Sequence, residues 1–167
     1  MKKLLYLFLA LPLIFSSCSK EEGCTDSAAS NYNADAEEDD GSCLYDISGV
    51  WETASATLNG SDDLLGQSEL TYIWADGQIG SETYDMNGDM TAYAIGMGVS
   101  APNNVINWTG TVYPTGGDSF EAYLDINIDI MTNNNNMTWN YVDYPTAADN
   151  YVKTLVRSTT HSLSDWE

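Results

Sequence analysis

The chain has few basic residues and a single histidine. Lysine and arginine together number 5 against 25 aspartates and glutamates, which gives a formal net charge of −20. This charge repels nucleic acid and anionic lipid surfaces, so we expect neither as a partner. The one histidine, His161, lies near the C-terminus, which argues against a histidine general base or a histidine-rich metal site.

Cysteine is equally sparse, with three residues that all precede residue 46. Its absence from the rest of the chain excludes a cysteine nucleophile or a zinc–cysteine cluster there. We find no Gly-x-Ser-x-Gly elbow, no phosphate-binding loop and no convincing helical period. Carboxylates abound, but no motif pairs them as a glycoside hydrolase requires. We therefore expect a protein that is not an enzyme.

The first 17 residues have the features of a signal peptide. Two lysines precede an apolar run over 4–15, and small residues follow it just before Cys18. The run is shorter than the roughly 20 residues of a membrane-spanning helix. Removing 1–17 removes two of the five basic residues, so the remaining 150 residues carry three basic and 25 acidic ones, a formal charge of −22. Residues 18–22 then form a polar tether.

The residues around the first cysteine resemble a bacterial lipoprotein processing site. Phe15-Ser16-Ser17-Cys18 is similar to a lipobox, with Phe15 where leucine is usual. The acidic segment 19–22 also resembles the export signal of Bacteroidetes-type surface lipoproteins. The resemblance implies acyl chains on Cys18 that anchor the protein in the outer membrane, at the cell surface. The alternative to the lipobox is an ordinary signal peptide with a chance cysteine. The alternative to the export signal is a plain hydrophilic linker.

Residues 23–45 resemble a small module of exported proteins from the same bacterial group. The matching residues are Gly23, Cys24, Thr25, Asp26, Asn31, Tyr32, Asn33, Asp39, Asp40, Gly41, Ser42, Cys43 and Tyr45. So short a piece cannot bury a core, and a Cys24–Cys43 disulfide would offset that by about 3 kcal/mol. This pairing leaves Cys18 for acylation.

The same module is rich in carboxylates that could gather around one cation. Calcium prefers several oxygen ligands, and four aspartates are candidates: Asp26, Asp35, Asp39 and Asp40. A Ca²⁺ ion is thus the one cofactor that the sequence suggests. The alternative is a solvated acidic spacer without metal.

From residue 46 to 157 the pattern is that of strands. We predict strands over 49–58, 68–75, 78–86, 89–99, 104–113, 119–131, 136–144 and 150–157, mostly separated by Asn-Gly, Asp-Gly or Pro-rich turns. The clearest alternation of apolar and polar residues runs over 120–130, which predicts one buried and one wet face. About eight antiparallel strands favour an up-and-down barrel, with a two-sheet sandwich as the alternative. Residues 158–167 are predicted to be a frayed tail.

The opening of this domain resembles a lipocalin-like barrel. Gly49-Val50-Trp51 stands at the start of the first strand, and Arg157 at the end of the last. An Asp-Gly turn at 76–77 also matches the pattern. The resemblance implies that Trp51 plugs one end of the barrel and that Arg157 packs over its indole. The alternative is a tryptophan in the core of a sandwich.

Aromatic residues are plentiful for a small β domain, with five tryptophans and eleven tyrosines in the chain. Five of them are candidates to line an interior cavity: Tyr72, Trp74, Trp108, Trp139 and Tyr141. Such a cavity suits a small apolar or glycan ligand. The same residues could instead fill a solid core, in a structural or adhesion module without a ligand. We expect a monomer in either case.

Lipidation at Cys18 is tested by replacing Cys18 with serine. We expect Cys18→Ser to move the protein from the membrane fraction to the soluble exported fraction, because no acyl chain can then be attached. Ser17→Ala, which keeps a small residue before the cysteine, serves as the control and should remain in the membrane fraction. Unchanged detergent partitioning of Cys18→Ser would contradict the assignment.

Overall fold

The computed structural model describes residues 20–101, 105–131, 135–142, 144–146 and 148–166. The chain folds as two compact units, one that ends at Leu44 and one that begins at Tyr45. The predicted signal peptide and Cys18 lie outside the described residues. Within the described ranges, no helix is long and apolar enough to cross a membrane.

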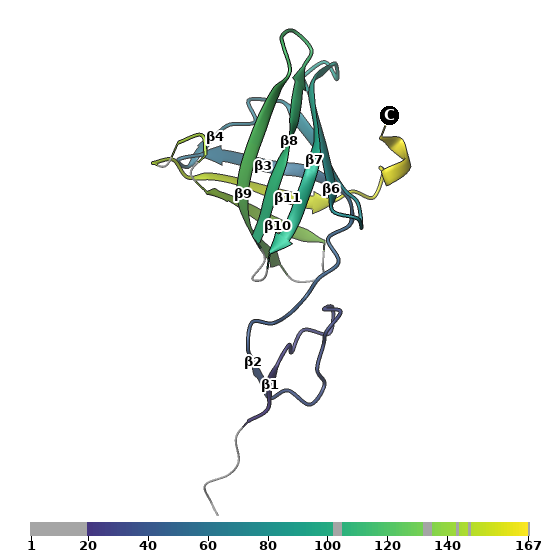
Figure 1. Ribbon diagram of the computed structural model, residues 1–167, viewed down its shortest axis with the longest axis vertical. Helices are drawn as coiled ribbons and strands as arrows, with labels where there is room; N and C mark the ends of the chain where they lie inside the picture. Colours follow the sequence, from purple (N-terminus) through teal and green to yellow (C-terminus); the bar gives the residue numbers. More distant parts are fainter. Residues whose placement is uncertain (1–19, 102–104, 132–134, 143, 147, 167) are drawn as a thin grey trace, which may run out of the picture. The chain divides into compact units, whose positions relative to one another are not determined.

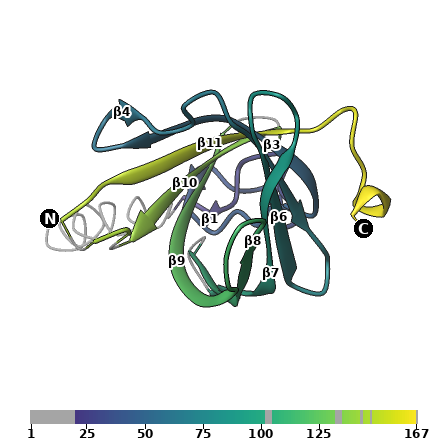
Figure 2. The same ribbon diagram turned by 90° about the horizontal axis from the view of Figure 1, so that it is seen from above.

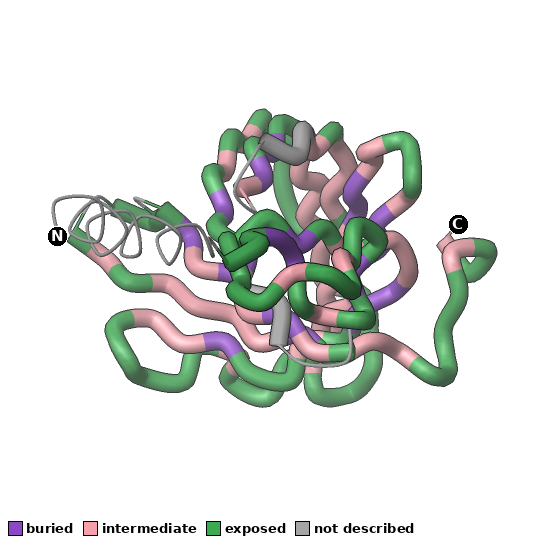
Figure 3. Tube along the Cα trace, turned by 90° about the horizontal axis from the view of Figure 1, so that it is seen from below, coloured by how far each residue is buried: buried purple, intermediate pink, exposed green. Residues whose placement is uncertain are grey.

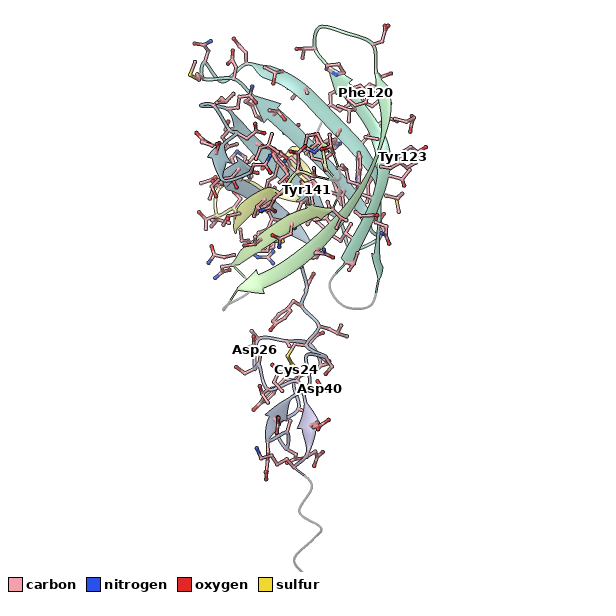
Figure 4. All side chains as sticks on the ribbon, turned by 90° about the vertical axis from the view of Figure 1, so that its left-hand side faces the viewer. Cys24, Asp26, Asp40, Phe120, Tyr123 and Tyr141 are labelled. Atoms are coloured by element: carbon pink, nitrogen blue, oxygen red, sulfur yellow. A yellow bond between two sulfur atoms is a disulfide. The ribbon has the colours of Figure 1, made fainter. Side chains whose placement is uncertain are left out.

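The first unit is held by a disulfide. Cys24 and Cys43 are bonded, with 4.8 Å between their Cα atoms, and both are buried. Strand β1 (Glu22–Gly23) pairs in parallel with β2 (Glu38–Asp39). Figure 4 shows the disulfide in yellow beside the label of Cys24, close to these two short strands. The predicted pairing of the two cysteines is confirmed.

Side chains of the module motif fix the course of its backbone. The Asn31 amide donates to the Ser42 carbonyl at 2.7 Å, and its oxygen accepts from the Leu44 N–H at 2.7 Å. Carboxylates and amides elsewhere accept the N–H two residues on, as in the bond from Gly41 to Asp39. The same local turn forms at Asp26, Asn33 and Asp40. The recurring Asn and Asp residues therefore replace the apolar core that this unit lacks.

The second unit is a closed barrel of eight antiparallel strands (Figure 1). Its strands are β3 (Gly49–Leu58), β5 (Ser68–Ile73), β6 (Gln78–Tyr84), β7 (Met90–Ala101), β8 (Val105–Pro114), β9 (Phe120–Met131), β10 (Asn136–Val142) and β11 (Tyr151–Arg157). Each pairs with the next, and β11 pairs with β3 to close the ring (Figure 2). The short β4 (Ser61–Asp62) pairs with the end of β3. One continuous ladder confirms the lipocalin-like barrel and excludes the sandwich.

The observed strands agree with the predicted ranges to within two residues at every end. The agreement reflects turn chemistry as much as hydrophobic alternation. Asn59 and Gly60 both take positive φ, at 53° and 81°, and Gly88 takes 85°. Asn and Gly tolerate this conformation at little cost, so an Asn-Gly pair marks the end of a strand in the sequence.

One end of the barrel is filled by apolar side chains. Figure 3 colours the trace by burial and shows buried segments on several strands of the barrel. We call the filled end the plugged end. Trp51, Met137 and Leu155 have no exposed surface there, and isoleucines from three other strands belong to the same apolar cluster: Ile73, Ile106 and Ile128. On β9 and β10, Ile128 and Met137 alternate with polar neighbours, so their burial follows from the strand period of two.

Trp51 and Arg157 close the plugged end together. They face each other in register on β3 and β11, and the Arg157 Cζ lies 4.3 Å from the centroid of the indole. The guanidinium donates to two carbonyls of the segment 46–48, at 2.6 and 3.0 Å, and the indole N–H donates to a third at 2.8 Å. A Cβ on Gly49 would lie 2.7 Å from the guanidinium, and the φ of Gly49 is +127°. The stack that the resemblance implied is present, and it requires the glycine.

The C-terminal tail differs from the frayed segment that we predicted. The Ser158 N–H donates to the Val50 carbonyl at 2.8 Å, and its hydroxyl donates to Glu52 at 2.6 Å. After a 3₁₀ turn, η2 (Leu163–Asp165), the Trp166 ring packs against Tyr72 with 4.9 Å between centroids. The polar composition of the tail gave no signal of this, because a single tryptophan carries the contact.

The stack at the plugged end is tested by substitution and urea unfolding. Trp51→Ala should lower the free energy of unfolding by about 3–5 kcal/mol, since it leaves a large cavity. Arg157→Lys should lower it by a smaller amount, because lysine cannot stack as a plane or bond two carbonyls as a fork. Asp118→Asn, in an exposed turn, is the control and should unfold like the parent chain. Equal stability of all variants would disprove the closure role.

Candidate functional site

A cavity of about 190 Å³ lies inside the barrel, and we call its location the cavity end. Tyr151 and Lys153, at the start of β11, line it, whereas Arg157 at the end of the same strand stacks at the plugged end. Its lining also includes Glu69, Thr71, Ser81, Thr83, Ala92, Ala94, Trp108, Val112, Leu124, Ile126, Trp139, Tyr141 and Tyr144. The barrel is thus solid at one end and hollow toward the other.

Strand pairing explains how the polar and aromatic lining comes together. Trp139 and Tyr141 of β10 stand opposite Lys153 and Tyr151 of β11. Residues two apart on a strand share a face, so these four side chains enter the same interior. In Figure 4 the labelled Tyr141 lies within the ring of strands, in agreement with its burial.

A lysine–glutamate ion pair lies in the wall of the cavity. The Lys153 Nζ is 2.7 and 2.6 Å from the two carboxylate oxygens of Glu69, and the side chains are only 11% and 13% exposed. The pair spans β3, which lies between β11 and β5. Ala56 is the register partner of Lys153 on β3, and its small side chain leaves room for the pair.

The charges in this wall are balanced. Burial, the largest single influence, would lower the pKa of Lys153, but the charge and hydrogen bond of Glu69, together with Tyr141 and Tyr151, outweigh it and hold that pKa above its ordinary value. Burial also raises the pKa of Tyr141, and it raises the pKa of Tyr151 to about 12. At neutral pH the lysine is therefore an ammonium and both phenols are protonated. The wall carries one positive and one negative charge, in contact.

Three tyrosines form a cluster beside this pair. The ring centroids of Tyr141 and Tyr151 are 5.1 Å apart. The ring centroid of Tyr144 lies 5.6 Å from that of Tyr141 and 5.4 Å from that of Tyr151. Tyr141 is buried, whereas Tyr144 is 40% exposed. The cluster therefore reaches from the interior to the surface, which makes it a candidate entrance to the cavity.

Trp108 forms part of the opposite wall, and glycines set its position. A Cβ on Gly110 would lie 2.4 Å from the indole ring, and one on Gly96 would lie 2.6 Å from the Gly110 Cα. The indole N–H donates to the Ile79 carbonyl at 3.3 Å. The ring can lie along the wall only because β7 and β8 carry glycine at these two paired positions.

One hydroxyl in the cavity lining has no hydrogen-bond partner among the described residues. It belongs to Thr71, which is 1% exposed. A buried hydroxyl without a partner costs about 1–3 kcal/mol, so such groups in native proteins usually meet a water or a ligand. Thr71 thus marks a place where a bound molecule would gain a hydrogen bond.

The structure brings three of the five predicted ligand-binding residues to the cavity: Trp108, Trp139 and Tyr141. Tyr72 and Trp74 do not line it. Tyr72 follows the inward-facing Thr71 on β5, so its own side chain points to the outside of the barrel. There it stacks on Trp74 with 5.9 Å between ring centroids and is covered by Trp166.

A second hollow, of about 610 Å³, lies on this outer face and includes Glu52, Tyr72, Glu82 and Tyr84 in its lining. One oxygen of the buried Glu82 accepts the hydroxyls of Tyr72 at 2.9 Å and Tyr84 at 2.8 Å. Burial, with this bond, raises the pKa of Tyr84 to about 12. The Ser158 hydroxyl lowers the pKa of Glu52. These carboxylates already have protein partners, so the larger hollow is the weaker candidate site.

Sequence reasoning missed Glu69, Thr71 and Lys153. A signal was available for the lysine, because it alternates with Tyr151 and Leu155 along a predicted strand. Such a position faces inward, and this chain has very few basic residues to place there. Glu69, which pairs with the lysine, and Thr71, whose hydroxyl lacks a partner among the described residues, give no comparable signal, since Glu and Thr are common on the solvent-facing side of a strand.

The predicted calcium ligands Asp26, Asp35, Asp39 and Asp40 all lie in the first unit. Across the described ranges, no group of three or more His, Cys, Asp or Glu residues is placed to hold a metal ion. The Ser42 hydroxyl and N–H lower the pKa of Asp40, which is thus already engaged in its turn. Calcium binding stays a prediction that this arrangement does not test.

No protein-family model matches the chain, and no curated protein matches it. Four solved chains are similar in structure. One is a selenomethionine derivative of a biogenic amine-binding protein, with 16% sequence identity and a TM-score of 0.47. The match covers 66% of this chain and 63% of that one, so it spans less than two thirds of that protein.

The ion pair is tested by removing its members singly and together. Glu69→Leu should lower the free energy of unfolding by about 3–5 kcal/mol, because it leaves the Lys153 ammonium buried without its counter-charge. The double variant Glu69→Leu with Lys153→Met should recover most of that loss, since no charge remains to be desolvated. Urea unfolding of the two single variants, the double variant and the parent chain completes the cycle. Additive losses would show that the two side chains do not interact.

Proposed function

We propose that the chain is an exported lipoprotein, anchored through Cys18, whose barrel binds a small and mainly apolar organic ligand. The observation that carries the proposal is the cavity at one end of the barrel. A domain selected only for stability would gain from filling this space, since cavities destabilise. The other end of the same barrel is filled, so the space is not a general property of its packing.

The chemistry of the cavity lining supports binding and not catalysis. Ligand pockets are mainly apolar and aromatic, with a few placed polar groups. Here Trp108, Trp139 and Tyr141 supply the aromatic surface, and the Lys153–Glu69 pair and Thr71 supply polar groups. The volume of about 190 Å³ holds about one ring, which favours a small apolar ligand over a glycan.

Export and anchoring are supported by the first unit and the charge. A disulfide as the main support of a small unit is typical of an oxidising compartment. Without residues 1–17 the chain has a formal charge of −22, so it would not adhere to an anionic membrane by electrostatics. Stable attachment would then depend on acyl chains at Cys18.

A second candidate is an adhesion module, in which the outer surface acts and the cavity is incidental. Exposed aromatic side chains on β9 favour it, since Phe120 is 56% and Tyr123 73% exposed, and Figure 4 shows both on the wall of the barrel. Exposed aromatics often mark contact surfaces. The two candidates differ in whether filling the cavity abolishes function.

Ligand binding is tested by filling the cavity. Toluene is titrated into the full chain carrying Cys18→Ser, with tryptophan fluorescence and calorimetry as readouts, and we expect saturable binding. Ala94 lines the cavity, so Ala94→Phe should weaken toluene binding at least tenfold by occupying its space. The matched control is Met97→Phe on the same strand, where the side chain is half exposed. Equal binding by both variants would reject the cavity as the site.

A further inference from the structure

The cavity has room for a single ring within its walls. It measures about 190 Å³, somewhat more than an apolar cavity of roughly 150 Å³ that admits benzene. Its walls include two indoles and a buried phenol, from Trp108, Trp139 and Tyr141. Aromatic rings prefer offset or edge-to-face contact with one another. One aromatic ring with a short substituent therefore fits both the space and the walls.

The charge balance of the wall disfavours a charged ligand. Lys153 and Glu69 are in direct contact, at 2.6 and 2.7 Å, and each neutralises the other. A charged molecule entering the cavity would lose its water without gaining a free counter-ion, which is costly in a buried site. An anion would also have to approach a chain with a formal charge of −20. A neutral ligand avoids both penalties.

The Thr71 hydroxyl adds a requirement for polarity. It is buried in the lining, and no described residue bonds it. A hydroxyl both donates and accepts, so it complements an alcohol, a phenol or a carbonyl oxygen. A hydrocarbon would leave the Thr71 hydroxyl unpaired, whereas a ligand oxygen at that point would relieve the penalty.

From these three features we infer that the cavity selects a neutral molecule with one aromatic ring and one hydroxyl or carbonyl oxygen. The ring lies among Trp108, Trp139 and Tyr141, and the oxygen bonds Thr71. The inference rests on the proposed ligand-binding function and adds the chemical class of the ligand.

The test compares four probes that share a ring and differ in one substituent: toluene, benzyl alcohol, benzoate and benzylammonium. Each is titrated calorimetrically into the full chain carrying Cys18→Ser, at neutral pH. Benzyl alcohol should bind about 3–10-fold more tightly than toluene, the ratio expected for one hydrogen bond. It should bind at least about tenfold more tightly than either charged probe, because these lack a counter-ion in the cavity.

Thr71→Val tests the hydroxyl itself, since valine keeps the shape of threonine and removes its polar atom. This substitution should weaken benzyl alcohol binding about 3–10-fold and leave toluene binding unchanged or tighter. Thr138→Val, on the polar face of β10, is the matched control and should preserve the parent ranking. Circular dichroism confirms folding, and the probe ranking on the parent chain decides the ligand class even if a variant does not fold.

The outcomes separate this inference from the proposed function. Equal binding of toluene and benzyl alcohol, or tightest binding of a charged probe, would overturn the ligand class while the cavity remains a binding site. If Thr71→Val weakened the binding of toluene and of benzyl alcohol equally, the role of the Thr71 hydroxyl would be overturned. Absence of binding by all four probes would overturn the inference and the proposed function together.

Discussion

Closure of the ladder between β11 and β3 is the constraint on which the rest of this barrel depends. Arg157 and Trp51 face each other across that ladder, 4.3 Å apart. Closing the ring removes both sheet edges and gives the strands a shared interior. With one end sealed by the stack and the apolar cluster around it, the other end need not be filled, and the cavity is compatible with a stable domain.

The fold was predictable from the sequence because its determinants are local. Apolar and polar residues alternate along the strands with a period of two, and Asn-Gly and Asp-Gly pairs mark the strand ends. Gly49, Trp51 and Arg157 pointed to the closure only through the resemblance to a lipocalin-like barrel. The disulfide was predictable as well, since its two cysteines flank a piece too small for a core. The strand, turn and disulfide signals lie within a few neighbouring residues, or within one motif, and need no knowledge of distant contacts.

The candidate site was only partly predictable, because its decisive features are relations between distant strands. Residue type alone suggested Trp108, Trp139 and Tyr141, but it also suggested Tyr72, which faces the other way. Whether a strand residue faces in or out depends on register, which a short aromatic-rich stretch does not reveal. The contact of Lys153 with Glu69 joins residues 84 positions apart and crosses an intervening strand, so no local pattern encodes it.

The location of the two basic side chains of the barrel affects how copies of this protein interact with one another in solution. From residue 46 onward the chain has one lysine and one arginine, Lys153 in the cavity wall and Arg157 at the plugged end. The outer wall is consequently left to carboxylates, and the barrel is a polyanion around a neutral interior. Neighbouring copies repel one another over about 10 Å at 0.1 M salt. Ionic strength, and not side-chain contact, should therefore set how closely these molecules pack.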